Sequence, residues 1–336
     1  MTAAAGLPGP QETPEETARF VIGTAVLAPS VHNTQPWRFA VRPGEISLYA
    51  DPDRWLAVAD PAGREMLISC GAALFNARLA LRYLGWVPET SVLPDPGRPM
   101  LVARISWARR ITPAAYECDL YQQVATRRTH RGGFEAGDLP AALLTALGRA
   151  AAQHGAALRF VTDGGPKAAL SAVVDAAEGL LRLDAARSQE VARWAAAPGS
   201  KRPDGVPATA YPAVPDVTDL AFPGRDFAQG RGWGTAPVLT APLMRSAGTP
   251  GVLTTPGDEP ADWVSAGQAL QRLLLDASSS GTAVALHTQP LELPELRKLV
   301  RVQLAGGSYP QMIVRLGRTS QTTTSSVRRP VRDVLL

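Results

Sequence analysis

The segment Ala28-Pro29-Ser30-Val31-His32-Asn33-Thr34-Gln35-Pro36-Trp37 concentrates hydrogen-bonding side chains between a predicted helix and a predicted strand. Pro29 disfavours a helical conformation for the residue before it, so the preceding helix must end near residue 28. The side chains of Ser30 and Asn33 could bond polyol or carbonyl oxygens of a planar cofactor, and Gln35 could order the turn. The same residues also fit an Asx-type turn that only links the two elements.

Hydrophobic periodicity on both sides of this segment predicts a chain that mixes helices and strands. The predicted helices cover residues 15–27, 63–84, 114–125, 140–154, 167–196 and 261–279. The predicted strands cover residues 37–41, 45–49, 100–106, 158–162, 238–243 and 311–316. Residues 198–235 are rich in Pro and Gly but also hold several aromatic side chains, which favours an ordered lid over a free linker. Residues 1–14 are Ala/Pro/Gly-rich and are predicted to be disordered.

The chain contains an internal repeat. Residues 69–74 align with residues 265–270, and residues 99–105 align with residues 310–316. Two Ala-rich helices can look alike by composition alone, but the second match lies in a strand and favours a true repeat. Gly71 and Gly267 would let the two helices pack closely. We therefore expect an α+β fold with two related halves, which span residues 15–112 and 113–336.

Three further polar segments are candidates for ligand contact. Arg127-Arg128-Thr129-His130-Arg131 brings three guanidiniums and a hydroxyl within five residues, and guanidiniums bind phosphate through paired, charge-assisted hydrogen bonds. A solvated basic turn is the other interpretation. Arg328-Arg329 could close over the same phosphate or belong to a frayed tail. His287-Thr288-Gln289 could face a cofactor edge or be a loop with no role.

Composition excludes several classes of protein. The chain has 336 residues, of which 45% are hydrophobic and 19% charged, so it is long and apolar enough to bury a core. A net charge of +4 is low for a dedicated nucleic-acid binder, so we expect no nucleic-acid partner. No apolar run approaches the roughly 18 residues that span a membrane, and no N-terminal signal segment is visible. Two distant cysteines and four histidines without ligand spacing predict a metal-free, cytoplasmic protein.

Common catalytic motifs are also missing from the sequence. There is no GxGxxG after a predicted strand, no Walker spacing, no HExxH and no GxSxG. A Rossmann dinucleotide site, a P-loop, a zinc hydrolase and a serine hydrolase are therefore not supported.

Together the motifs resemble a known superfamily. Residues 28–39 resemble the PSxxNxQPWxF signature of the FMN-dependent nitroreductases, and residues 127–131 resemble their RRSxR phosphate-binding motif. Residues 306–317, followed by Arg329, resemble their C-terminal strand and phosphate-contacting arginine. The basic motif normally comes first, and here it comes second. That order, with the repeat, resembles the Acg family of tandem nitroreductase-like proteins, and the resemblance covers residues 15–336.

The resemblance implies a fold and one cofactor site. Each half would be a mixed sheet flanked by helices, and the two halves would form an intramolecular pseudo-dimer, so a monomer is expected. Only one complete FMN site can be assembled, since each half keeps only one of the two motifs; the pseudo-symmetric site should be empty. The residues implied in FMN binding are Ser30, Asn33, Gln35, Arg127, Arg128, Thr129, Arg131, His287, Thr288, Gln289, Arg328 and Arg329.

The resemblance also implies a reaction. The expected function is an NAD(P)H-dependent oxidoreductase that passes a hydride through flavin N5 to a small aromatic or quinone-type acceptor. No residue of the chain is expected to act as an acid or base, since the flavin carries the chemistry. A closed lid at residues 198–235 would exclude nicotinamide, so the alternative is a protein that sequesters or stores FMN.

Overall fold

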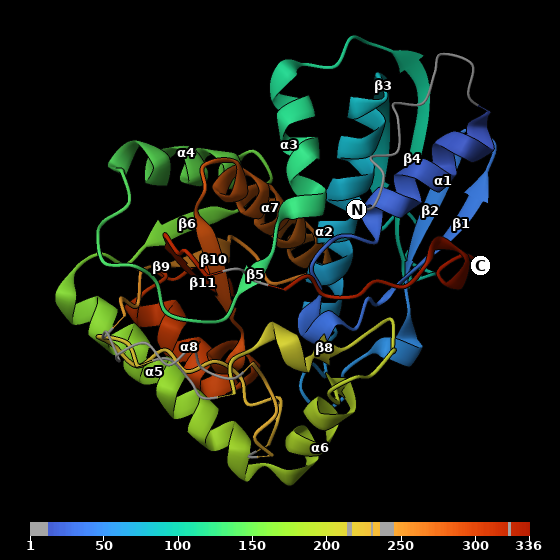
Figure 1. The fold of residues 1–336 in the computed structure, drawn as a ribbon. Helices are drawn as coiled ribbons and strands as arrows, with labels where there is room; N and C mark the ends of the chain where they lie inside the picture. The colour runs from blue at the N-terminus through green and yellow to red at the C-terminus, as the bar shows by residue number, and fades with distance from the viewer. Residues whose placement is uncertain (1–12, 214–216, 230, 236–244, 322–323) are drawn as a thin grey trace.

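The computed structural model describes residues 13–213, 217–229, 231–235, 245–321 and 324–336. Two sheets lie on either side of a pair of long central helices (Figure 1). The first half contains α1 (Pro14–Ala25), η1 (Val31–Asn33), β1 (Trp37–Arg42), β2 (Glu45–Ala50), η2 (Pro52–Arg54), α2 (Arg64–Tyr83), β3 (Trp86–Val92) and β4 (Leu101–Arg110). The second half contains α4 (Ala141–Ala152), β6 (Ala157–Phe160), α5 (Gly164–Leu183), α6 (Ala185–Trp194), β9 (Thr249–Thr255), α7 (Pro260–Ser279), β10 (Ala283–His287), η4 (Gln289–Glu292), α8 (Pro294–Gln303) and β11 (Tyr309–Gly317).

The two halves share one topology. The strand order is β1-β2-β4-β3 in the first sheet and β6-β9-β11-β10 in the second, and every one of these neighbours is antiparallel. A helix precedes the first strand of each half, and the central helix follows the second strand. In the second sheet, β5 (Thr129–His130) adds in parallel with β10. In the first sheet, a parallel bridge between Phe39 and Leu335 adds the end of the chain to β1, so each half contains both pairings.

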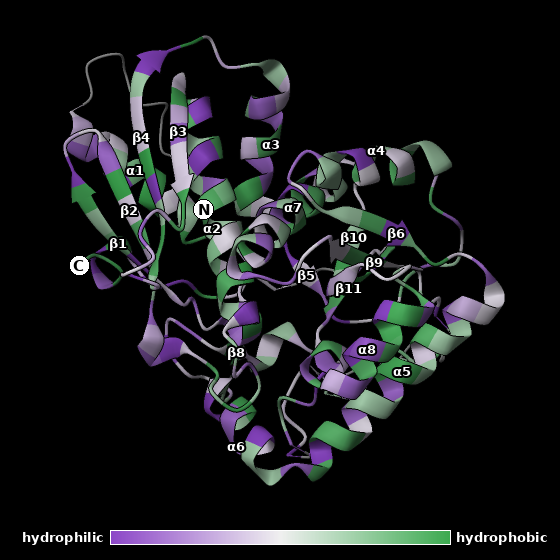
Figure 2. Ribbon diagram, turned by 180° about the vertical axis from the view of Figure 1, so that it is seen from behind, coloured by the Kyte–Doolittle hydropathy of each residue, from purple (hydrophilic) through white to green (hydrophobic). Residues whose placement is uncertain are grey.

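The central helices α2 and α7 meet at the aligned glycines. A Cβ atom on Gly71 would lie 2.2 Å from the Val264 carbonyl oxygen, and one on Gly267 would lie 2.0 Å from the Ile68 carbonyl oxygen. Only glycine fits at either position, since real Cβ atoms do not approach so closely. Hydrophobic residues run along both helices at the centre of the molecule, while the outer end of β4 is hydrophilic (Figure 2).

The halves differ most at one connection. A Pro43-Gly44 turn joins β1 to β2, whereas the matching strands β6 and β9 are joined by residues 161–248. This insertion carries α5, α6 and the small pair β7 (Ala195–Ala196) and β8 (Val206–Pro207), followed by η3 (Ala208–Ala210). The single helix expected over residues 167–196 is wrong. Asp184 has an extended backbone there, and its side chain accepts from the amides of Ala186 and Arg187, which begins a new helix.

Two segments of the chain, one after β4 and one after β11, cross from one half to the other. Helix α3 (Ala115–Thr126) packs on both central helices and leads into β5 of the second sheet. After β11 the chain returns to the first half, where η5 (Val331–Asp333) lies beside β1 (Figure 1). There the Phe39 amide donates to the Val334 carbonyl oxygen at 2.8 Å, and the Leu336 amide donates to the Phe39 carbonyl oxygen at 2.9 Å.

Some elements were not expected from the sequence. They are β3, β9, β10 and α8. The strand expected over residues 238–243 and nearly all of the N-terminal segment 1–14 lie outside the described residues. Across the part of the chain that is described, no helix is both long and apolar enough to cross a membrane.

Candidate functional site

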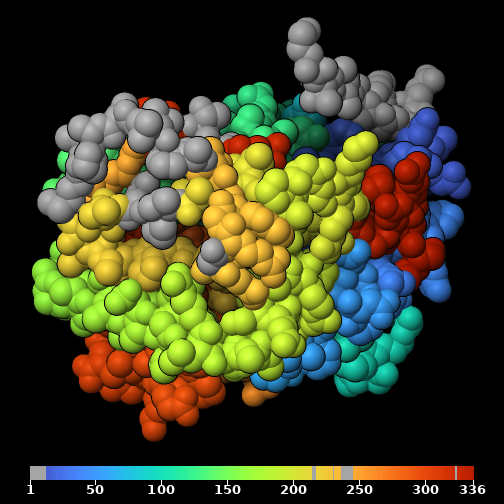
Figure 3. Space-filling view, turned by 60° about the horizontal axis from the view of Figure 1, so that its bottom comes forward, coloured from blue at the N-terminus to red at the C-terminus, as the bar shows by residue number. Residues whose placement is uncertain are grey.

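A cavity of about 940 Å³ lies between the two halves. Its wall combines the loop after α1, the first turns of α2, residues 124–133, the loop after β10 and parts of the insertion 161–248. Yellow residues of the insertion lie between α5 and the blue first half in the space-filling view (Figure 3). The sequence-predicted residues that line the cavity are Ser30, Asn33, Arg127, Arg128, Thr129, Arg131, His287, Thr288, Gln289 and Arg328.

Four guanidiniums face one another in this wall: Arg127, Arg128, Arg131 and Arg328. They donate to neutral groups: Thr129 Oγ1, the side-chain oxygen of Asn33, and backbone carbonyls. Among the described residues, none of the four pairs with a carboxylate. The buried Nε atoms of Arg127 and Arg328 have no hydrogen-bond partner among those residues. The chemistry of this donor set suits an anionic ligand.

Burial and mutual repulsion lower the pKa values of these arginine side chains. Burial, then Arg328, Arg128 and Arg131, lowers the pKa of Arg127 to about 9. Burial lowers the pKa of Arg131 to about 10, and burial with Arg128 and Arg131 lowers that of Arg328 to about 10. An anionic ligand would reverse these shifts, because it favours the charged form of each guanidinium.

The loop after α1 has a constrained backbone. His32, Asn33 and Gln35 have φ values of 47°, 55° and 53°, in the left-handed region that costs non-glycine residues energy. Ser30 compensates by accepting from the Gln35 amide through its Oγ at 2.9 Å. Such strain is typical of functional loops. Here it turns Ser30, His32 and Asn33 toward the cavity.

Asn33 makes three hydrogen bonds within the protein. Its amide nitrogen donates to the carbonyl oxygens of Gly205 at 2.9 Å and Val327 at 3.1 Å, and its amide oxygen accepts from Arg328 Nη1 at 3.0 Å. Only the amide oxygen retains a lone pair for a further donor. Asn33 positions Arg328 and fastens the insertion to the first half.

Gln35 and Arg329 are structural and do not line the cavity. Gln35 Nε2 donates to the Pro203 carbonyl oxygen at 2.9 Å, and Gln35 Oε1 accepts from the Arg329 amide at 2.8 Å. The Arg329 guanidinium lies 3.7 Å from Asp51 Oδ2 and bonds the carbonyl oxygens of Gln35 and Asp333. Of the two arginines expected at the cofactor, Arg328 lines the cavity and Arg329 does not.

The loop after β10 is also tied to the insertion. Gln289 Nε2 donates to Glu178 Oε2 and to the Pro223 carbonyl oxygen, both at 3.3 Å. Thr288 Oγ1 donates to Glu292 Oε1 at 2.7 Å and accepts from Arg225 Nη2 at 3.3 Å. His287 Nε2 accepts from Arg315 Nε at 2.8 Å, so the ring proton must sit on Nδ1. Burial, with Arg315, lowers the pKa of His287 well below its usual value.

His32, Glu65 and Arg225 are among the cavity residues that the sequence analysis did not single out. His32 is buried and meets the ring of Phe227 edge-on, with centroids 5.4 Å apart. Its pKa is lowered well below the usual value by burial, then by Arg225 and Arg131. Glu65 and Arg225 come from segments far apart in the chain. No motif marks them, although the position of His32 inside the quoted loop was a usable signal.

Curated relatives match nearly the whole chain. A Mycobacterium tuberculosis H37Rv protein named "Putative NAD(P)H nitroreductase" is 34% identical over 329 residues, covering 94% of this chain and 91% of its own. The chain belongs to the nitroreductase family. The "Putative NAD(P)H nitroreductase acg" of the same organism is 26% identical over 326 residues, covering 95% of each chain. The chain thus belongs to the nitroreductases together with the acg protein, while no family model matches it.

Solved nitroreductases are more distant from this family member. A nitroreductase from Anabaena variabilis covers 92% of the chain and 90% of its own length at 12% identity, with a TM-score of 0.47. The FMN-dependent nitroreductase NfnB from Mycobacterium smegmatis, solved with NADPH, covers 64% of this nitroreductase-family chain and 96% of its own length. Its identity is 16% and its TM-score 0.38.

Proposed function

We propose that this chain binds one FMN in the cavity between its halves and works as an NAD(P)H-dependent oxidoreductase on a small aromatic or quinone-type acceptor. The observation that carries the proposal is the group of four cavity arginines without a carboxylate partner among the described residues. A phosphate monoester is the anion that such a group suits, because guanidiniums bind it in paired hydrogen bonds.

The rest of the cavity suits the remainder of a flavin. Ser30 and Thr129 supply hydroxyls beside the arginines, and the insertion supplies Phe222 and Phe227 as aromatic walls. The cavity volume of about 940 Å³ is within the range for cofactor pockets. A bound flavin would supply hydride transfer through its N5 atom, while the chain orients the ring and excludes water.

The four arginines would make different contributions to phosphate binding, according to their positions. Arg127 is buried, so its hydrogen bonds to phosphate would be formed away from water and would be strong. Arg128, Arg131 and Arg328 are half-buried and would add charge-assisted hydrogen bonds that are partly exposed to water. Asn33 would act through Arg328, whose guanidinium it holds at 3.0 Å.

A second function, storage or sequestration of FMN, is favoured by a specific observation. Residues 203–225 of the insertion are bonded by Asn33, Gln35, Arg131 and Gln289, so four of the predicted site residues also hold the lid closed. A closed lid limits the approach of NAD(P)H and of a bulky acceptor. The reductase and the storage protein share the same flavin site and differ in how often the lid opens.

The visible spectrum of the purified protein tests both. Flavin absorbance at about one FMN per chain, on a particle of monomer mass in light scattering, supports the single site between two fused halves. Bleaching by NADPH without oxygen supports the reductase, whereas flavin that stays oxidised supports storage. A colourless protein that does not bind added FMN contradicts both.

Variants test the arginine assignment. We expect Arg131→Ala to weaken FMN binding roughly a hundredfold, because it removes charge-assisted bonds in a buried site. Asn33→Ala should have a smaller effect, since it only releases Arg328. Arg149→Ala is the matched control, because Arg149 is exposed on α4. Wild-type FMN affinity in both Arg131→Ala and Asn33→Ala would remove these residues from the site.

A further inference from the structure

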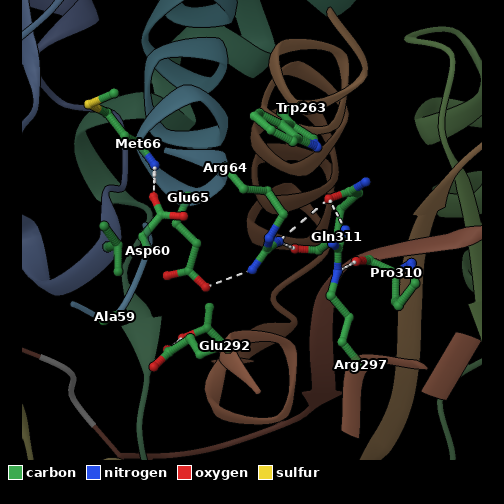
Figure 4. A network of polar contacts seen from close by, with 12 residues as sticks. Ala59, Asp60, Arg64, Glu65, Met66, Trp263, Glu292, Arg297, Pro310 and Gln311 are labelled. Carbon is green, nitrogen blue, oxygen red and sulfur yellow. Dashed lines mark hydrogen bonds and ion pairs between the residues drawn. The ribbon is translucent and has the colours of Figure 1, made fainter. Parts of the chain in front are cut away.

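A second charged cluster borders the cavity where α2 begins opposite η4 (Figure 4). Asp60, Glu65 and Glu292 are buried there. Arg64 Nη2 lies 2.8 Å from Glu65 Oε1, and Arg225 bonds Glu292 Oε1. Among the described residues, these two guanidiniums are the ones buried between the three carboxyls. Figure 4 shows the Glu65 carboxyl between Arg64 and Glu292.

The charged residues around this cluster do not neutralise its excess of carboxylates over guanidiniums. Arg187 lies 3.9 Å from Glu292 Oε2 but closer, at 3.2 Å, to Asp184. Arg225 also faces Glu178, which pairs with the half-exposed Arg182. On the far side of Arg64, Arg297 is paired with Asp258 at 2.6 Å. The cluster therefore holds one negative charge too many, which favours the uptake of one proton, since an uncompensated buried carboxylate is costly.

Hydrogen bonding decides which carboxyl holds that proton. Asp60 Oδ2 accepts from the Met66 amide at 2.9 Å, which satisfies a free N–H at the start of α2. Glu292 Oε1 accepts from Thr288 and Arg225, and its Oε2, which has no hydrogen-bond partner in the described part of the chain, faces Arg187 at 3.9 Å and does not line the cavity. Glu65 accepts only from Arg64, and its Oε2 is buried without a partner in the wall of the cavity. Glu65 is thus the carboxyl that is least stabilised as an anion.

We propose that Glu65 is neutral at pH 7 and presents its Oε2–H to a hydrogen-bond acceptor on the ligand in the cavity, so that ligand binding retains one proton. The proposal rests on the proposed function, because a flavin ring carries carbonyl oxygens and imine nitrogens that accept such a bond. Burial, then the charge of Glu292, raises the pKa of Glu65 well above its usual value.

The pH dependence follows from the sign of this coupling. Below the pKa of Glu65 in the free protein, the O–H is present and affinity is constant. Above that pKa the ligand must find a carboxylate or bind with proton uptake, so the dissociation constant rises by up to tenfold per pH unit. FMN affinity also falls as pH rises through the lowered pKa values of the cavity arginines, so the part that belongs to Glu65 is the difference between the wild type and a variant that cannot ionise at this position.

The experiment measures the dissociation constant of FMN from pH 5 to pH 10 for the wild type and three variants. Glu65→Gln keeps an N–H donor, so it should retain the pH dependence that is due to the arginines and lose the part that is due to Glu65. Glu65→Ala should bind about tenfold more weakly at low pH, from the loss of one buried hydrogen bond. Glu190→Gln is the matched control, since Glu190 is equally buried but bonds the Val58 and Ala59 amides outside the cavity. It should keep the wild-type profile.

A second measurement does not need the cofactor. The infrared carbonyl stretch of a neutral carboxyl should be present in the flavin-free wild type at pH 7.5 and absent in Glu65→Gln. If the wild type lacks that band, or if wild type and Glu65→Gln share one pH profile for FMN, the proposal is wrong while the flavin site stands. Failure of the wild type to bind FMN at any pH would instead contradict the proposed function.

Discussion

The arginine side chains in the cavity wall repel one another. This repulsion lowers the free energy of unfolding of the flavin-free protein. Arg127 and Arg328 each have a lowered pKa partly because of neighbouring arginines. Any small anion that reaches them should therefore stabilise the flavin-free protein. We expect inorganic phosphate to raise the melting temperature of the flavin-free protein, and FMN to raise it further. At a hundred times its dissociation constant, FMN should add about 3 kcal/mol to the free energy of unfolding.

Differential scanning calorimetry of the flavin-free protein measures this effect, with matched ionic strength in chloride as the reference. In Arg131→Ala the shift caused by phosphate should shrink, because one contact is lost. Equal shifts in the wild type and in Arg131→Ala would show that phosphate acts elsewhere.

Asp60 makes stability depend on pH. Burial and the charge of Glu292 raise its pKa to about 6, against an ordinary value of 3.8. The folded state thus favours the protonated form, and the stabilisation is complete below about pH 4 and lost as pH rises to 6. Relative to Asp60→Asn, which cannot ionise, the wild type should lose about 2–3 kcal/mol between pH 4 and pH 7.

Urea unfolding at each pH measures that difference. An Asn oxygen can still accept from the Met66 amide, so the cap of α2 is retained in the variant. A difference between the two proteins that stays constant from pH 4 to pH 7 would contradict the assignment to Asp60.

Sequence patterns identified many of the residues that line the cavity, but not the role of each one. The quoted loop and the basic motif supply much of the cavity wall. The choice between Arg328 and Arg329 depends on a backbone that runs past Asn33, and adjacent side chains point in different directions there. Glu65 is a charged residue in the first turn of a helix, where side chains are usually exposed. Its burial could therefore not be predicted from the sequence.

At the scale of the helices, the crossing of α2 and α7 depends on two glycines. We expect Gly71→Ala to destabilise the protein by more than about 3 kcal/mol, because the new Cβ meets backbone atoms that cannot move alone. Gly179→Ala is the control: this helical glycine on α5 has open space around its Cβ position, and alanine there should stabilise slightly. Similar unfolding midpoints for the two variants would contradict the close approach of the helices.

The elements that the sequence missed have identifiable causes. Strand β3 contains Pro88, a residue that central strands exclude, and β3 tolerates it because it is an edge strand. The break between α5 and α6 depends on Asp184 as a cap in the middle of an apparently continuous helical pattern. Helices α2 and α7, the first hairpin and β11 were predicted close to their observed bounds, because each has a clear period and clear ends.

At the scale of the whole molecule, Arg54 fastens the insertion 161–248 to the first half. Arg54 Nη1 donates to the Thr34 carbonyl oxygen and to Asp204 Oδ2, both at 2.9 Å. Arg54→Ala should loosen the first half from the insertion and speed FMN dissociation by about tenfold. Stopped-flow measurement of FMN release tests this, with the exposed Arg98→Ala as the control.

If the reductase is the function, Arg54→Ala should also speed reduction by NADPH, since the lid opens more often. An unchanged rate of FMN release in Arg54→Ala would mean that the base of the insertion does not govern access.

The unequal connections of the two halves have a consequence for how such a chain diverges. In a dimer of identical subunits every substitution appears twice, so an insertion that helps one site is imposed on its symmetric copy. Here the equivalent hairpins are separate stretches of one chain: a Pro43-Gly44 turn joins the strands of the first, and residues 161–248 join those of the second. In such a chain each half can change without the other, so one of two equivalent crevices can be specialised alone.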